Sequence, residues 1–393
     1  AHRGITVFRA NAAFHADEIA PATSNHIVHL VPSPDQSDIL TYHKADVPEP
    51  SGPTMDLTAT NIVIATGAKP HPLPGNPFAG ALIDSTQALE VNEFPSSAVI
   101  IGAGAIALEF ASMWNAAGSK VTLLIRKDRV LSAWDRRAGT TLTRELKRHG
   151  VNIITRASVT HVDTGANLGA TVHYTREGQD GEQSVRGEIA LVAIGRDPIT
   201  DPAWGVTIDD HGHVATDAYG RTDKPGVWAV GDVTAGHALA HRAFEQGIVI
   251  AETIAGLNPK PVDEATVPQI VFSFPEAASV GLTVEQAQAR EDLVEIKETN
   301  YPMLANARML MSGTAGSLTI VSGCDAANPD TPRVLGVHMV SQMASDIIAE
   351  AEQLVGNHVP LADAARLVHP HPTFSETLGE ALLKADGRPL HTR

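Results

Sequence analysis

The clearest pattern of apolar and polar positions lies in the first third of the chain. A run of β-branched and apolar residues, Ala98–Ile101, ends at the glycine-rich stretch GAGAIA. Good helix formers follow as far as Ala117, Gly118 stops them, and a second apolar run covers Val121–Ile125. Strand, glycine turn, helix and strand in this order predict a βαβ unit of the kind that binds dinucleotides.

Gly102, Gly104 and Ala107 occupy the small positions of the glycine-rich turn. We expect Gly102 to permit the tight turn and Gly104 to bring backbone close to a pyrophosphate at the positive helix end. Ala107 stands where a small residue packs the helix against the strand. The alternative is a glycine turn in an α/β domain without a nucleotide. The strand before the turn and the charged strand end after it favour nucleotide binding.

The end of the second strand bears on the choice of nucleotide. Arg126 and Lys127 stand there, Arg129 follows closely, and Asp128 is the one opposing charge. An acid at this place would bond the ribose 2′-OH of NAD, whereas Arg accommodates the 2′-phosphate of NADP. The cations favour NADP(H), and a solvated surface turn is the alternative.

Other apolar runs predict further strands. The first 60 residues alternate short apolar stretches with polar turns, as in a small meandering sheet. Two buried strands end alike, one in Thr66-Gly67 and the other in Gly195-Arg196. This likeness predicts two domains of similar plan, each with a strand that ends at a cofactor edge.

A third strand end carries an acid. An apolar strand leads to Gly231-Asp232, and a helix is predicted from about Leu239 to Gln246. Asp after such a glycine suits a hydrogen bond to a ligand hydroxyl, and a plain turn is equally compatible with it. His237 and His241 have the i, i+4 spacing of a helical metal pair, but no third ligand is evident nearby. The sequence therefore predicts no metal site.

After Pro261 the pattern predicts an α+β domain of strands and two helices, which ends in HPHPTFSE. Pro370 and Pro372 prevent a regular strand that would set both histidines of this stretch on one face. A rigidly held His371 with Glu376 five residues on suits an acid–base pair better than a metal pair. A structural histidine is the alternative.

Composition narrows the function. The net charge of −16 over 393 residues argues against a general nucleic-acid or anionic-membrane binder. No apolar run approaches the ~20 residues of a membrane span, and the first residues show neither a signal-peptide pattern nor an initiator Met. The single cysteine, Cys324, excludes an internal disulfide and predicts a cytoplasmic protein. We interpret it as an incidental thiol in a turn.

Several motifs in a fixed order resemble those of the class I flavoprotein pyridine nucleotide-disulfide oxidoreductases, and within them the dihydrolipoamide dehydrogenases most closely. These motifs are ATG, GAGAIALE, AIGR, GVWAVGD, ALAHRAFEQG, VPQIVFSFPEAASVGLT and HPHPTFSE. The resemblance implies an α/β protein with two Rossmann-like nucleotide-binding domains and a C-terminal α+β dimerisation domain. In order along the chain it implies a first FAD-binding part (1–88), an NAD(P)-binding domain (89–221), a second FAD-binding part (222–262) and the dimerisation domain (263–393).

The resemblance also implies roles for single residues. FAD and NAD or NADP are the cofactors, and the motif positions named above, from Thr66 to Arg196, lie at their sites. Asp232 would bond the FAD ribitol, the backbone of Leu239, Ala240 and His241 would approach the flavin, and Glu109 would lie near the nicotinamide. His371, oriented by Glu376, would exchange a proton with a small dithiol such as dihydrolipoamide in the partner subunit of a homodimer.

Nothing in the chain matches the N-terminal part of that family, which carries a further GxGxxG unit and a CxxxxC pair. We therefore expect a fragment that does not catalyse thiol–disulfide exchange unaided. Two alternatives stay open. One is an NADPH-dependent reductase of glutathione or mycothione disulfide, which Arg126 and Lys127 favour. The other is a nucleotide-binding dimer module without catalysis.

Overall fold

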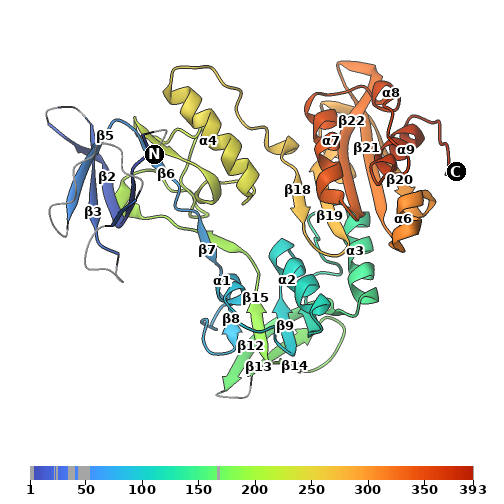
Figure 1. Cartoon of the computed structure of the whole chain (residues 1–393), viewed down its shortest axis with the longest axis horizontal. Coiled ribbons are helices and arrows are strands. Elements are labelled where there is room, and N and C mark those ends of the chain that lie inside the picture. The colour runs from blue at the N-terminus through green and yellow to red at the C-terminus, as the bar shows by residue number, and fades with distance from the viewer. Residues whose placement is uncertain are drawn as a thin grey trace. The chain divides into compact units, whose positions relative to one another are not determined.

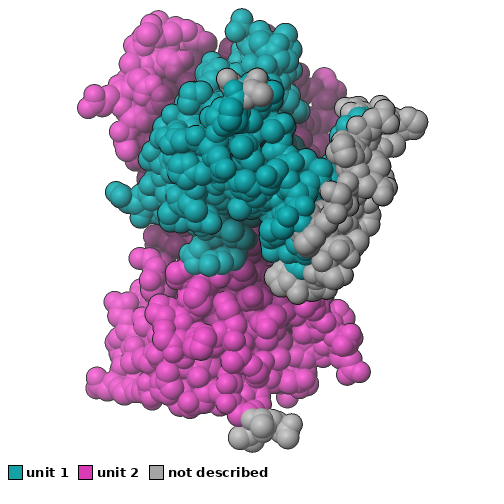
Figure 2. Space-filling model, turned by 90° about the vertical axis from the view of Figure 1, so that its left-hand side faces the viewer, with its two compact units in different colours: residues 1–69, 197–264 teal, residues 70–196, 265–393 magenta. Residues whose placement is uncertain are grey.

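The computed structural model describes residues 4–21, 23, 25–33, 40–42, 54–165 and 169–392. The chain divides into two compact units, which Figure 2 shows in different colours. Unit 1 comprises residues 1–69 and 197–264, and unit 2 comprises residues 70–196 and 265–393. The three boundaries fall in strand β7 (Ala68–Pro70), in strand β16 (Arg196–Pro198) and in the 3-10 turn η3 (Glu264–Thr266). The four-part division at residues 88, 221 and 262 stays a prediction.

A parallel sheet of five strands in unit 2 carries the predicted βαβ unit (Figure 1). Its order is β11–β10–β9–β15–β8, and each of its pairings is parallel. The chain passes from β9 to β10 and β11 on one side and later to β15 on the other, so the strand order reverses beside β9. Such a reversal is where open α/β sheets bind their ligands. The strands are β8 (Leu82–Ile83), β9 (Ser97–Ile101), β10 (Lys120–Leu124), β11 (Asn152–Ile154) and β15 (Ile189–Val192).

Helices and a small hairpin sheet complete this part of unit 2. Helix α2 buries Ala107, Leu108 and Trp114, and α3 starts at Asp135, whose carboxylate accepts from the amide of Ala138 at 2.8 Å. The elements are α1 (Ser85–Leu89), α2 (Ala105–Ala116), α3 (Arg136–Arg148) and the antiparallel strands β12 (Ala157–Gly165), β13 (Gly169–Arg176) and β14 (Gln183–Gly187).

The C-terminal part of unit 2 is the predicted α+β arrangement. An antiparallel sheet has the order β18–β19–β22–β21–β20, and α7, α8 and α9 pack on its strands. The strands are β18 (Gln269–Val271), β19 (Glu276–Gly281), β20 (Leu293–Pro302), β21 (Ser317–Asp325) and β22 (Asn328–Ser341). The helices are α5 (Val284–Gln288), α6 (Ala307–Ser312), α7 (Ala344–Gly356), α8 (Leu361–Ala364) and α9 (Glu376–Ala385), with the 3-10 turn η4 (Met303–Ala305).

The interpretation of Cys324 as a loop thiol was wrong. Cys324 lies within β21 and is only 1% exposed. Strand β21 runs on through Gly323 and Cys324 before the chain turns at Ala326 and enters β22. The sequence after Cys324 is rich in turn formers, and they mark the end of the strand rather than the place of the cysteine.

Unit 1 is built from small sheets and one long helix. The first residues form the predicted meander, an antiparallel sheet of β2 (Asn11–Ile19), β3 (His26–Val31) and β5 (Met55–Ala59), while β1 (Val7–Arg9) pairs with β4 (Leu40–Tyr42). β6 (Ile62–Ile64) pairs in parallel with β17 (Val227–Ala229). The 3-10 turns are η1 (Pro202–Trp204), η2 (Gly231–Val233) and η3 (Glu264–Thr266), and α4 spans Ala240–Ile254, longer than predicted. Among the described helices, none combines the length and apolar character that a membrane crossing requires.

Candidate functional site

Gly102 forms the tight turn at the carboxyl end of β9. Its φ is +140°, a conformation that side chains rarely allow. A Cβ atom here would lie 2.1 Å from the carbonyl oxygen of Ala193, which follows β15, and 3.4 Å from the Cβ of Ala107. The ends of β9 and β15 thus approach so closely that only glycine fits, and Ala107 is fully buried where the sequence placed it.

Gly104 is the N-cap of α2 and presents open backbone. A Cβ atom at Gly104 would have nothing within 4 Å. No side chain caps this helix end, so the first amides of α2 are left for a ligand. An uncapped helix N-terminus with an unobstructed backbone at the strand reversal fits the pyrophosphate of a dinucleotide.

The cations after β10 divide into two kinds. Arg126 and Lys127 are exposed and make no side-chain hydrogen bond or ion pair within the described part of the chain. Arg129 instead turns inward, with Nη1 3.3 Å from Asp128 and Nη2 donating to the carbonyl of Ser132 at 3.0 Å. Since β10 lies beside β9, the two exposed cations follow the strand next to the glycine turn.

Gly195 and Arg196 follow β15 at the same sheet edge. Both are exposed, Gly195 has a φ of +147°, and a Cβ on it would meet nothing within 4 Å. The amide of His71 donates to the carbonyl of Gly195 at 3.0 Å. The structure therefore brings the glycine turn of β9 and the predicted AIGR strand end together at one edge.

The predicted residues of unit 1 gather at an open pocket of about 320 Å³. Gly67, Gly231 and Asp232 line it together with Ala243 and Gly247 of α4. Gly67 has a φ of +71° and nothing within 4 Å of a Cβ position, so its backbone is open to a ligand. The half-buried carboxylate of Asp232 and the open backbone of Gly67 can form hydrogen bonds to the hydroxyl groups of a ligand here.

Two predicted contacts in unit 1 take a different form. The hydroxyl of Thr66 donates to the carbonyl of Ile199 at 2.6 Å, so this side chain supports the local backbone. Leu239 is the N-cap of α4, with Ala240 and His241 in its first turn, and no side-chain cap closes this helix end. Its first amides are therefore open to a ligand.

Glu109 of α2 holds the segment after β18. Its Oε1 accepts from the amide of Phe272 at 2.9 Å, and one turn further on the hydroxyl of Ser112 accepts from the amide of Phe274 at 2.8 Å. These two hydrogen bonds were not predicted, because no local pattern in the sequence indicates a contact between residues more than 160 positions apart. Glu109 thus fixes the phenylalanine segment in the described chain.

His371 and Glu376 form the predicted pair. His371 Nδ1 donates to Glu376 Oε1 at 2.8 Å, and the imidazole is 72% exposed. The Glu376 carboxylate is held a second time, since its Oε2 accepts from the amide of Thr373 at 2.7 Å. Partial burial acts to raise the pKa of Glu376, but these hydrogen bonds outweigh it and lower the pKa below its ordinary value. The carboxylate stays charged and orients the ring.

Thr373 is the member of this site that the sequence analysis missed. Thr373 and Glu376 have the T-x-x-E spacing of a capping box, in which the acid returns to the backbone amide three residues earlier. This signal was present in the sequence. The Thr373 hydroxyl donates to the carbonyl of Pro370 at 2.7 Å and lies 2.9 Å from the Ser375 hydroxyl.

His369, the other histidine of the motif, has a structural position. Its side chain is 9% exposed, and its Nε2 donates to Glu350 of α7 at 2.9 Å. This hydrogen bond raises the pKa of His369, against the opposing effect of burial. Gly379 of α9 has no room for a Cβ, which would lie 2.4 Å from the His369 ring. The buried ring thus fastens the start of the motif to α7 and α9.

The sequence matches the family profile of the pyridine nucleotide-disulphide oxidoreductases over residues 18–247. It matches the profile of their dimerisation domain over residues 267–382. Dihydrolipoyl dehydrogenase of Cupriavidus necator is 37% identical over 341 residues, which cover 85% of this chain and 70% of that protein. A dihydrolipoyl dehydrogenase of Bacillus subtilis is 36% identical with the same coverage.

Two solved structures are similar throughout most of the chain. LpdA from Mycobacterium tuberculosis superposes with a TM-score of 0.80 at 25% identity, over 96% of this chain and 76% of that one. The HOCl-induced flavoprotein disulfide reductase RclA from Escherichia coli gives a TM-score of 0.73 at 26% identity, over 84% of this chain and 74% of that one.

Proposed function

This chain belongs to the pyridine nucleotide-disulphide oxidoreductase family, and on that premise we propose that it acts as a dihydrolipoyl dehydrogenase-type flavoprotein. Members of the family are oxidoreductases that use FAD and a nicotinamide nucleotide. The dihydrolipoyl dehydrogenases of Cupriavidus necator and Bacillus subtilis match over most of this chain, which supports a small dithiol of the dihydrolipoamide class as substrate.

The observation that carries the proposal is the pair of His371 and Glu376. With Nδ1–H donated to Glu376, the exposed Nε2 keeps its lone pair and can accept a proton. The thiolate rather than the thiol is the nucleophile in thiol–disulfide exchange. His371 would therefore take the proton of a dithiol, and Glu376 would stabilise the imidazolium that forms. The thiolate would attack the CxxxxC disulfide that the resemblance to the family implies, and one sulfur of that disulfide would leave as a thiolate.

The cofactor positions follow from the open backbone. Gly102 and Gly104 at the end of β9 would hold the nicotinamide nucleotide, and Gly67, Gly231 and Asp232 would hold the flavin nucleotide. FAD, when bound, carries an electron pair between the thiol substrate and the nicotinamide. The residues of this chain bind and orient, and His371 moves the proton.

The described residues do not include a redox-active cysteine pair. The sequence holds one cysteine, Cys324, and burial in β21 raises the pKa of its thiol. A thiol with a raised pKa is a poor nucleophile. We therefore assign no step to Cys324.

The prediction of a cytoplasmic location rests on this single cysteine.

We infer a homodimer, which the match to the family's dimerisation domain supports. Apolar side chains on η4 and α6 are exposed in the single chain: Leu304 at 61%, Leu310 at 65% and Met311 at 68%. Neighbouring exposed apolar residues of this kind mark interaction surfaces. In the dimer, His371 would serve the site of the partner subunit.

A second candidate is an NADPH-dependent reductase of another small disulfide. It is favoured by Arg126 and Lys127, the exposed cations at the end of β10 where NAD-dependent proteins carry an acid. The two candidates agree on His371 and Glu376 and differ in the small dithiol or disulfide that the enzyme turns over.

The test is a steady-state comparison on the protein expressed from its natural gene. We expect oxidation of dihydrolipoamide, with NADP⁺ preferred over NAD⁺ because of the two cations. Turnover of glutathione or mycothione disulfide with NADPH, without turnover of lipoamide, would select the second candidate. A protein that binds nucleotide and oxidises no thiol in any combination would refute both.

A further inference from the structure

Two histidines stand opposite each other on the hairpin sheet of unit 2, away from the glycine turn. His161 of β12 and His173 of β13 are direct partners in the antiparallel register. Their rings stack with centroids 4.1 Å apart and planes 8° apart. Directly opposed residues of an antiparallel pair share a face of the sheet, with Cβ atoms about 4.5–5.5 Å apart. The register therefore presents two imidazoles side by side to solvent.

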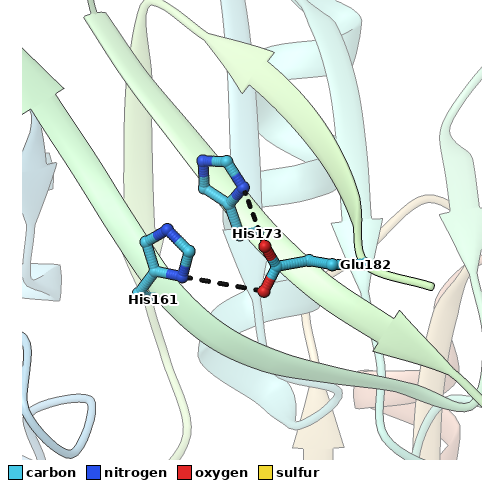
Figure 3. Close-up of side chains that lie close together, drawn as sticks. All are labelled: His161, His173 and Glu182. Atoms are coloured by element: carbon cyan, nitrogen blue, oxygen red, sulfur yellow. Dashed lines mark ion pairs between the residues drawn. The ribbon is translucent and has the colours of Figure 1, made fainter.

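A carboxylate faces both rings from the adjoining strand (Figure 3). Glu182 precedes β14; its Oε1 lies 3.8 Å from His161 Nδ1, and its Oε2 lies 3.6 Å from His173 Nδ1. One nitrogen from each ring and one oxygen of Glu182 all lie within 4.8 Å of one another. Three potential ligands, from β12, from β13 and from the residue before β14, thus lie close together.

We propose that His161, His173 and Glu182 bind a divalent transition-metal ion of the Zn²⁺ class. Imidazole suits Zn²⁺, Ni²⁺ and Cu²⁺, and a carboxylate oxygen is an ordinary third ligand of Zn²⁺. Bonds of about 2.0–2.2 Å to the ion bring tetrahedral ligand atoms to roughly 3.3 Å from one another. The carboxylate–imidazole distances of 3.6 and 3.8 Å would shorten to that value by side-chain rotation, and the stacked rings would turn so that both Nδ1 lone pairs face the ion. The fourth position faces solvent.

A second carboxylate, Asp163, favours in His173 the tautomer that the metal needs. Asp163 Oδ2 lies 3.0 Å from His173 Nε2 and 3.9 Å from His161 Nε2, on the side of the rings opposite Glu182. When Nε2–H of His173 donates to Asp163, its Nδ1 carries the lone pair and points to Glu182. Metal-binding histidines almost always donate their other ring N–H in this way.

The third ligand is oriented as well. Thr160 donates its hydroxyl to Glu182 Oε1 at 2.6 Å, which holds the carboxylate toward the two rings. The Thr160 hydroxyl oxygen also lies 3.3 Å from His161 Nδ1, a contact that a metal ion at this nitrogen would replace. The register of β12 and β13 shifts between Val159 and His161, so Thr160 is the extra residue of a bulge. Bulges redirect side chains, and this one places an orienting hydroxyl beside the first histidine.

The competing explanation is a cluster of protonated imidazoles paired with carboxylates and no metal. Unit 1 offers a matched comparison for it. His29 also lies between two carboxylates, with Nδ1 2.7 Å from Asp56 and Nε2 3.1 Å from Glu18. His29 has partners of the same two types, one Asp and one Glu, but no second imidazole beside it. It therefore provides the ion pairing without the second nitrogen ligand.

The experiment is calorimetric titration of the purified chain with Zn²⁺ in a buffer that does not chelate metals. We expect one Zn²⁺ site. Loss of a residue that only orients a ligand usually lowers metal affinity by roughly 10–100-fold, so His161→Ala or His173→Ala, which removes a ligand, should lower the Zn²⁺ affinity by at least that factor. Asp163→Asn should weaken it by about that factor with the circular dichroism unchanged. His29→Ala should bind Zn²⁺ like the wild type.

Co²⁺ supplies an independent readout, since its d–d absorption bands in the visible range become intense when protein ligands hold the ion in tetrahedral geometry. The spectrum should be lost in the His161 and His173 variants and kept in His29→Ala. A wild-type chain without a Zn²⁺ site, or equal binding by all variants, would overturn the proposal. None of these readouts depends on flavin, nicotinamide or thiol oxidation, so the outcome is separate from that of the proposed function.

Discussion

Two glycines two positions apart should respond to alanine in opposite ways. Gly102→Ala adds a methyl group 2.1 Å from the carbonyl oxygen of Ala193 and 2.8 Å from its carbonyl carbon, at a φ of +140°. Gly104→Ala adds the same methyl group at a φ of −91°, with nothing within 4 Å. The first change therefore disturbs the fold, and the second changes only the surface that a ligand would meet.

The magnitudes follow from the bonds at stake. Backbone strain at such a φ costs on the order of 1–3 kcal/mol. The clash also pushes apart the ends of β9 and β15, which are joined by the 2.8 Å hydrogen bond from the Ala193 amide to the Ile101 carbonyl. Loss of that hydrogen bond costs about 0.5–1.5 kcal/mol. We expect Gly102→Ala to lower the free energy of unfolding by roughly 2–4 kcal/mol. Gly104→Ala, at an N-cap, should cost no more than about 1 kcal/mol.

The assays are urea denaturation and a fluorescence titration with NADPH. Gly104→Ala should unfold near the wild-type midpoint and bind NADPH at least about tenfold more weakly, because the methyl group occupies the pyrophosphate position. Wild-type affinity in Gly104→Ala would refute the assignment of this turn to the nucleotide. Wild-type stability in Gly102→Ala would refute the close approach of the two strand ends.

Three further predictions concern charge and exposure. The double variant Arg126→Ala, Lys127→Ala should bind NADPH about tenfold or more weakly and NADH almost as well as the wild type. The reason is that hydrogen bonds from the two cations to the 2′-phosphate, which only NADPH carries, would each contribute about 1.5–3 kcal/mol. Calorimetric titration with both nucleotides checks this. The raised pKa of His369 stabilises the fold below pH 6.5, and this contribution is lost as pH rises through the folded pKa. Glu350→Gln should therefore destabilise the chain more at pH 5.5 than at pH 8.5, measured by urea denaturation. Cys324 should resist iodoacetamide in the native chain and react after unfolding, followed by mass spectrometry.

The local parts of the site could be predicted from the sequence, since each lies within a few residues. Gly102, Gly104 and Ala107 take the positions that their spacing predicts, because the order strand, glycine, helix leaves one arrangement. His371 and Glu376 meet because the chain between them is short and turns. Such short-range geometry follows from residue types alone.

The missing parts depend on pairing between distant segments. His161 and His173 are separated by a hairpin with a bulge, and a shift of one residue would move either ring to the other face. The hydrogen bond from the amide of Phe272 to Glu109 joins the segment after β18 to helix α2. These two segments are far apart in the sequence, so the local pattern of residues gives no signal for it. Cys324 was misplaced because the turn formers follow it closely, although the strand continues through it.

The measurement that tests the central claim most directly compares two half-reactions in His371→Gln, made in the protein expressed from its natural gene. Dihydrolipoamide oxidation should fall by about 10²–10⁴-fold, the usual contribution of a general acid–base group, while NAD(P)H oxidation by an artificial acceptor stays near the wild-type rate. His391→Gln is the control, because His391 forms a similar exposed pair with Glu380 of α9 at 2.9 Å and should leave both rates unchanged. Equal loss of both half-reactions in His371→Gln, or no loss of thiol oxidation, would contradict the role of His371 as the proton acceptor.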